Sequence, residues 1–105
     1  MAVGVVLDFK GATLDQYDQV IEKMGLQLGK PLSQGGLAHW VTKTDDGIRV
    51  YDLWETREEF EKFAQEQIGP FAQEAGFPNQ PEITFHPAHN FLLTPDVKAL
   101  AGQSA

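Results

Sequence analysis

The sequence contains no cysteine. This absence excludes disulfides, thiolate zinc sites, cysteine-ligated iron–sulfur clusters and thiol nucleophiles. Basic residues are also few: eight Lys and Arg stand against fifteen Asp and Glu, for a formal net charge of −7. Because nucleic acids and anionic membranes both bind basic surfaces, we expect neither as a partner.

Long hydrophobic runs are missing as well. The apolar run near the N-terminus, Val3 to Leu7, is too short for a signal-peptide core or a membrane-spanning helix. We therefore expect a cytoplasmic protein. The 105 residues, 42% of them hydrophobic, are enough for one globular domain over 1–105, with a core at about 2–93 and a tail over 94–105.

The first half of the chain predicts a strand followed by a helix. Apolar and β-branched residues over 2–9 indicate a buried strand. Thr13 and Gln16 form a capping box, after which apolar residues recur at helical spacing until Gly25 or Gly29. The chain thus opens with a β-α unit.

The second half of the chain predicts a β-hairpin, then a second helix, then a last strand. Strands are predicted over 37–43 and 48–55, joined by a short turn that contains Asp46-Gly47. The second helix starts at the Thr56 capping position, and we expect Gly69-Pro70 to break or kink it. A last strand lies within 83–93, and a short helix is expected from residue 94.

The resulting order, β-α-β-β-α-β, predicts an α+β, ferredoxin-like fold: a four-stranded antiparallel sheet with two helices on one face. The strands carry large apolar groups on both faces, since Val5 and Val6 alternate in the first strand and Tyr51 and Trp54 in the third. The face without helices needs a cover, and we expect a second copy of the chain to provide it. The prediction is therefore a homodimer that closes into an α/β barrel.

The chain resembles the dimeric α/β-barrel superfamily, which includes the antibiotic-biosynthesis-monooxygenase-like and stress-responsive barrel proteins. The resemblance rests on the element order and on two segments, Gly36-Leu37-Ala38-His39-Trp40 and Gly47 to Thr56, followed by Phe60 and Phe63. It implies a small-molecule pocket in each barrel. Members of the superfamily include cofactor-free oxygenases, haem-degrading enzymes, cyclases and isomerases, and the Asn, His, Trp constellation of the haem-degrading members is not recognisable here.

Histidines are the first candidates for chemistry. His39 and His86 lie in predicted strands and could act as general acid or base, because the pKa of imidazole lies near neutrality. Asp52 could orient such an imidazole as the third catalytic residue. The alternatives are a structural histidine, and for Asp8 and Asp52 a salt bridge with Arg49 or Lys10 or a place at the sheet rim.

Metal and cofactor sites are not predicted. A metal would require His39, His86 and a carboxylate to converge by folding, and no spacing matches a zinc or iron signature. We expect no cofactor.

Aromatic residues could line a pocket for a hydrophobic or aromatic small molecule, although strand aromatics often serve the core or a dimer interface. Trp40 and Tyr51 could also stack across the hairpin. The candidates are Trp40, Tyr51, Trp54, Phe85 and Phe91.

Two functions follow from these residues and the resemblance. The first is a cofactor-free monooxygenase-like enzyme, isomerase or cyclase acting on an aromatic or polyketide-like molecule. The alternative is a non-catalytic ligand-binding or stress-related barrel protein, in which the polar strand residues serve packing.

Overall fold

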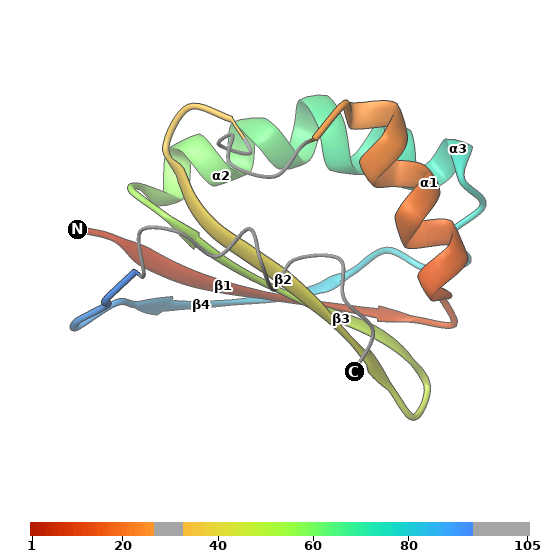
Figure 1. The fold of residues 1–105 in the computed structure, drawn as a ribbon, viewed down its shortest axis with the longest axis horizontal. Helices are drawn as coiled ribbons and strands as arrows, with labels where there is room; N and C mark the ends of the chain where they lie inside the picture. The colour runs from red at the N-terminus through yellow and green to blue at the C-terminus, as the bar shows by residue number, and fades with distance from the viewer. Residues whose placement is uncertain (27–32, 94–105) are drawn as a thin grey trace.

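The fold is a four-stranded antiparallel sheet covered on one face by helices (Figure 1). The computed structural model describes residues 1–26 and 33–93. The elements are β1 (Val3–Lys10), α1 (Leu14–Met24), β2 (Gly36–Thr44), β3 (Gly47–Trp54), α2 (Arg57–Phe63), the π-helical turn η1 (Ala64–Ile68), α3 (Gly69–Glu74) and β4 (Glu82–Pro87). This is the predicted ferredoxin-like α+β fold.

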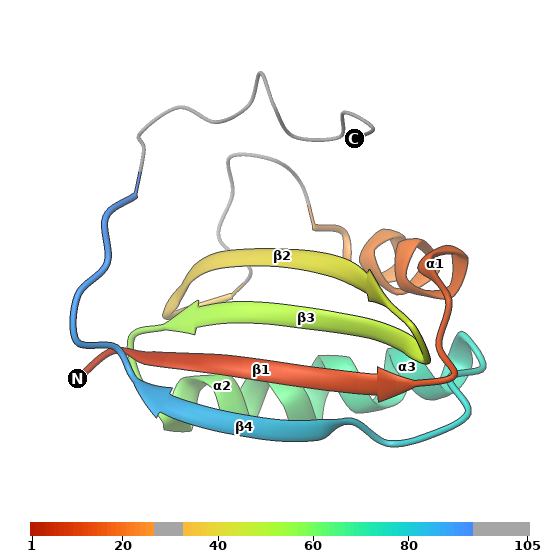
Figure 2. The same cartoon turned by 90° about the horizontal axis from the view of Figure 1, so that it is seen from below.

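The strand order is β2-β3-β1-β4, so β1 and β3 form the centre of the sheet (Figure 2). All three pairings are antiparallel. The view from below shows the sheet in front and the helices behind it, and we call these the outer face and the helix face. None of the described helices is long and apolar enough to cross a membrane.

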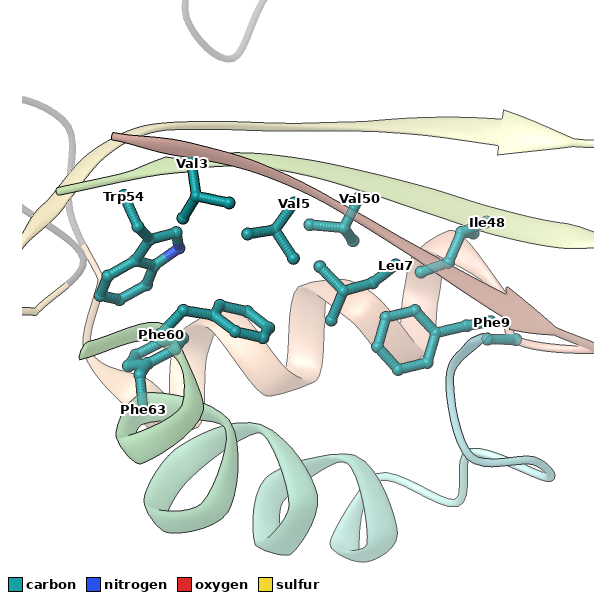
Figure 3. Close-up of a cluster of buried hydrophobic side chains, with 10 residues drawn as sticks. Val3, Val5, Leu7, Phe9, Ile48, Val50, Trp54, Phe60 and Phe63 are labelled. Carbon is teal, nitrogen blue, oxygen red and sulfur yellow. The ribbon is translucent and has the colours of Figure 1, made fainter. Parts of the chain in front are cut away.

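The hydrophobic core lies between the helix face and the helices (Figure 3). In β1 every second residue is buried, from Val3 to Phe9, and Ile48, Val50 and Trp54 continue the same face in β3. From α2, Phe60 packs on Trp54 edge to face, with ring centroids 5.8 Å apart. Strand residues that alternate with a period of two thus pack in one core against helix residues that recur with a period of 3.6.

The ends of α1 follow the predicted signals. The Thr13 side chain accepts a hydrogen bond from the Gln16 backbone N–H, and the Gln16 side chain accepts one from the Thr13 backbone N–H. Gly25 ends the helix in the left-handed region, at φ 70°. The other predicted end, Gly29, and the predicted helix in the tail over 94–105 lie outside the described residues.

Of the two outcomes predicted at Gly69-Pro70, a break or a kink, the break does not occur, and the helix is distorted there instead. The chain stays helical there by widening into η1, where the N–H of Gly69 donates to the carbonyl of Ala64, five residues earlier. Pro70 then falls in the first turn of α3, a position at which a helix tolerates a residue without an N–H. One long helical segment therefore runs along the sheet in place of two broken pieces.

Candidate active site

The β2–β3 hairpin brings His39 and Asp52 together. A two-residue turn pairs Thr44 with Gly47, and counting back along both strands from that pair places His39 opposite Asp52. Opposed residues of an antiparallel pair share a face, with Cβ atoms about 5 Å apart. Both side chains point to the helix face, where Asp52 is the one buried charged residue of the described chain.

Asp52 is held by two N–H donors. His39 Nδ1 lies 2.6 Å from one carboxylate oxygen, and Trp54 Nε1 donates to the other over 3.1 Å. The Asp52 side chain is only 3% exposed, and a carboxylate buried to this extent requires such partners. Because an ionised carboxylate only accepts, the proton of a neutral His39 resides on Nδ1 and leaves the lone pair on Nε2.

Helix α1 supplies the third member of the chain. The Tyr17 hydroxyl hydrogen-bonds to His39 Nε2, and the two rings lie nearly parallel, with an interplanar angle of 8°. Burial raises the pKa of the Tyr17 hydroxyl, and the negative charges of Asp52 and Asp18 act in the same direction. Tyr17 therefore keeps its proton at neutral pH, and the hydrogen bonds run Tyr17–His39–Asp52–Trp54.

An apolar cavity of about 40 Å³ adjoins this hydrogen-bonded chain. It lies between the sheet and the helices, and Tyr17, His39 and Asp52 are its titratable residues. The other lining residues are Leu7, Phe9, Val20, Ile21, Met24, Leu26, Val50, Phe63, Ile68, Ala72 and Phe77. The arrangement combines an imidazole that can accept a proton, an orienting carboxylate and an apolar space, which are the components of a general acid–base site.

His86 does not join this site. It stands opposite Gly4 in the β1–β4 pairing, on the outer face, and is exposed. His39 and His86 thus lie on opposite faces of the sheet, so Asp52 cannot orient both and a metal shared by the two within one chain is excluded. Within residues 1–26 and 33–93 no three His, Asp or Glu side chains are grouped as a metal ion would require.

The two predicted acids have different partners. Asp8 forms the expected ion pair with Arg49, at 2.6 Å, on the outer face. The same alternative is wrong for Asp52, because residues of β3 alternate and Arg49 points to the opposite face.

None of the five predicted pocket aromatics lines the cavity. Trp54 is 0% exposed in the core, and Phe85 packs on Phe60 with the Arg57 guanidinium 3.9 Å from its ring centre. Trp40 and Tyr51 stack across the hairpin as predicted, at 4.9 Å, but on the outer face. There they line an open hollow together with Phe91.

Sequence reasoning missed Tyr17 as a site residue, because its place in the apolar stripe of α1 is also that of a core residue. The available signal is its hydroxyl: a buried tyrosine requires a hydrogen-bond partner, and the stripe faces the strand that carries His39.

Comparison with known proteins supports the fold. No protein-family model and no curated protein matches the chain. The structure is similar to a mutant of SnoaB from Streptomyces nogalater, a cofactor-independent oxygenase, with a TM-score of 0.57, 16% identity, and coverage of 87% of this chain and 96% of that one.

Two further solved structures have the same fold. The monooxygenase ActVA-Orf6 of Streptomyces coelicolor, solved with nanaomycin D, has a TM-score of 0.50 at 19% identity, covering 89% of this chain and 91% of that one. A proposed antibiotic biosynthesis monooxygenase from Deinococcus radiodurans has a TM-score of 0.56 at 12% identity, covering 90% and 98%. The chain therefore has the ferredoxin-like fold of antibiotic-biosynthesis-monooxygenase-like proteins, as the resemblance in its sequence implied.

Proposed function

We propose that the protein is a cofactor-independent, monooxygenase-like enzyme that removes a proton from a hydroxylated aromatic or polyketide-like molecule. The observation that carries this proposal is the hydrogen-bonded chain Tyr17–His39–Asp52, which ends in an apolar cavity. The folds of SnoaB and ActVA-Orf6 support the oxygenase chemistry by analogy.

His39 is the proposed base. Asp52 fixes its Nδ1–H, so that Nε2 can accept a proton from an acidic C–H or phenol of the substrate, and the carboxylate stabilises the imidazolium that forms. In the protein without substrate the Tyr17 hydroxyl hydrogen-bonds to His39 Nε2, and the substrate replaces Tyr17 as the partner of that nitrogen. Its hydroxyl, which burial keeps protonated, can then donate to the developing oxyanion.

The oxygenation step uses dioxygen as the co-reactant. The substrate carbanion transfers electrons to dioxygen, a C–O bond forms, and protonation by His39 gives a hydroperoxide. Loss of water then converts the original CH₂ group to a carbonyl, so that one CH₂ and one O₂ yield one C=O and one H₂O.

The test is oxygen uptake with anthrone, whose CH₂ group is acidified by two flanking rings and a carbonyl system. We expect His39→Ala to lower the catalysed rate by about 10²- to 10⁴-fold. The matched control is His86→Ala, which removes an exposed imidazole from the outer face and should leave the rate unchanged. Equal rates for wild type and His39→Ala would sink the proposal in favour of the non-catalytic ligand-binding protein.

A homodimer is part of the same proposal. The outer face carries Trp40, 54% exposed, and Phe91, 43% exposed, beside an open apolar hollow. A second sheet packed there would cover these groups. Native mass spectrometry should give the mass of two chains, and a monomer at micromolar concentration would contradict this part.

A further inference from the structure

A second hollow lies beside the cavity at His39. It is an open groove of about 650 Å³ between the helical segment η1–α3 and the loop that leads into β4. Small-molecule sites have volumes of about 300–1,000 Å³, so the groove has the size of such a site. The cavity at His39, at about 40 Å³, is small for an aromatic ring, since a cavity known to bind benzene has about 150 Å³.

The groove and the cavity share a wall. Leu7, Ile68, Ala72 and Phe77 line both hollows. Leu7 is 1% exposed and fixed in the core, whereas Ile68 and Phe77 are half-buried. Ile68 ends the π-helical turn, a distortion that is frequent at functional sites, and Phe77 lies in a loop. These two side chains are the half-buried part of the wall between the groove and the cavity.

The chemistry of the groove selects an uncharged ligand. No residue among those described as lining it is charged, although 22% of the chain is. Its polar side chains are four amides, which both donate and accept hydrogen bonds and so suit neutral carbonyl and hydroxyl groups. A charged ligand would lose its hydration without gaining a partner ion. The amides are Gln65, Gln73, Asn79 and Gln80.

The loop side of the groove is held in place. The Asn79 side chain donates to the Lys10 carbonyl over 2.9 Å, and the Phe77 ring meets Phe9 edge to face, with centroids 5.1 Å apart. The groove is therefore a formed feature of the fold, and displacement of the Ile68 side chain alone opens the wall while these loop contacts stay in place.

We propose that this groove binds the body of a neutral, flat, hydroxylated ring system and presents its reactive edge to His39 between Ile68 and Phe77. The inference rests on the proposed function for the role of His39, but binding in the groove is measurable without turnover. The ligand class is a fused-ring phenol or ketone with oxygen substituents along its edge, which the amides recognise.

The test uses 1-naphthol as the probe, titrated into ¹⁵N-labelled protein. We expect the side-chain NH₂ signals of Gln65, Gln73 and Gln80 to shift on binding. Ile68→Trp should weaken binding at least tenfold by filling the passage. The matched control is Leu14→Trp, which adds the same indole at a 41% exposed residue of α1 that lines neither the groove nor the outer hollow, and should bind as wild type. Shifts confined to the outer hollow, or unchanged binding by Ile68→Trp, would overturn the inference.

A second variant covers the case in which Ile68→Trp does not fold. Gln65→Glu with Gln73→Glu changes two exposed amides to carboxylates, preserves their shape, removes two donors and places charge in the groove. Binding of 1-naphthol should weaken by about tenfold, as expected for lost hydrogen bonds. Wild-type affinity in this variant would also overturn the inference.

Failure of this inference and failure of the proposed function give different results. His39→Ala lies outside the groove and should retain 1-naphthol binding within about twofold while losing anthrone turnover. If the probe leaves the amide signals unshifted while turnover depends on His39, the groove is wrong and the catalytic proposal stands. The reverse pattern refutes catalysis and leaves the groove as a binding site.

Discussion

Replacing Asp52 by Asn tests the hydrogen-bonded chain with almost no change in shape. The carboxylate accepts from His39 Nδ1 on one oxygen and from Trp54 Nε1 on the other. An amide offers one oxygen and one NH₂ group, so one of the two N–H donors must face another donor. His39 can avoid this conflict only by moving its proton to Nε2, where it no longer accepts from Tyr17.

The expected losses of stability and turnover follow from the hydrogen bonds that Asp52→Asn removes. A hydrogen bond to a charged group contributes about 1.5–3 kcal/mol, so Asp52→Asn should lower the unfolding free energy by about 2 kcal/mol. In a domain of this size the midpoint of thermal unfolding falls by about 10 °C. His39, the proposed base, loses the Nε2 lone pair that would accept the substrate proton, so kcat with anthrone should fall by about 10²- to 10⁴-fold.

The assay pairs thermal unfolding with oxygen uptake. The control is Asp8→Asn, which removes the same charge from the half-exposed ion pair with Arg49 on the outer face. Such a surface pair contributes about 0.2–1 kcal/mol, and turnover should be unaffected. Equal stability and turnover in the two variants would refute the reasoning that Asp52 positions the His39 proton.

Two further predictions concern the fold around the site. Folding raises the pKa of the Tyr17 hydroxyl above its ordinary value of 10.0, so the folded state retains a proton that the unfolded chain releases. The stability that this proton contributes is complete below about pH 10 and is lost as the pH rises further. Urea unfolding between about pH 8 and 11 should therefore show a steeper fall of the unfolding free energy with pH in wild type than in Tyr17→Phe. Parallel plots of unfolding free energy against pH would contradict this prediction. Gly47→Ala places a Cβ 2.0 Å from the Phe9 carbonyl oxygen, at the start of the hairpin, and should lower the unfolding free energy by about 2 kcal/mol or more. Gly25→Ala, whose Cβ meets no atom within 4 Å, should lower it by about 1 kcal/mol. Equal losses for the two variants in chemical denaturation would refute the close approach at Gly47.

The sequence was sufficient for the fold because local signals and the hydrophobic pattern agree. The short turn at 45–46 fixes the hairpin register, and that register alone places His39 opposite Asp52. The ion pair of Asp8 with Arg49 follows from the pairing of β1 with β3 in the same way. Turn chemistry and strand parity are therefore sufficient, once the strands are paired, to derive these individual contacts.

The remaining features depend on contacts between distant elements. Parity assigns two faces to a strand but does not say which one the helices cover, so His86 was grouped with His39 although they lie on opposite faces. The role of Tyr17 depends on how α1 crosses β2. The groove depends on the helix passing Pro70 through a π-helical turn, whereas local rules for proline predict a break or a kink without saying which.

The most direct test of the account is the tautomer of His39, read from the ¹⁵N chemical shifts of its imidazole by NMR. The structure predicts that the neutral ring carries its proton on Nδ1, toward Asp52, with an unprotonated Nε2 that accepts from Tyr17. In Asp52→Asn the proton should move to Nε2. A wild-type ring protonated on Nε2, or one that averages freely between tautomers, would contradict the site at its centre.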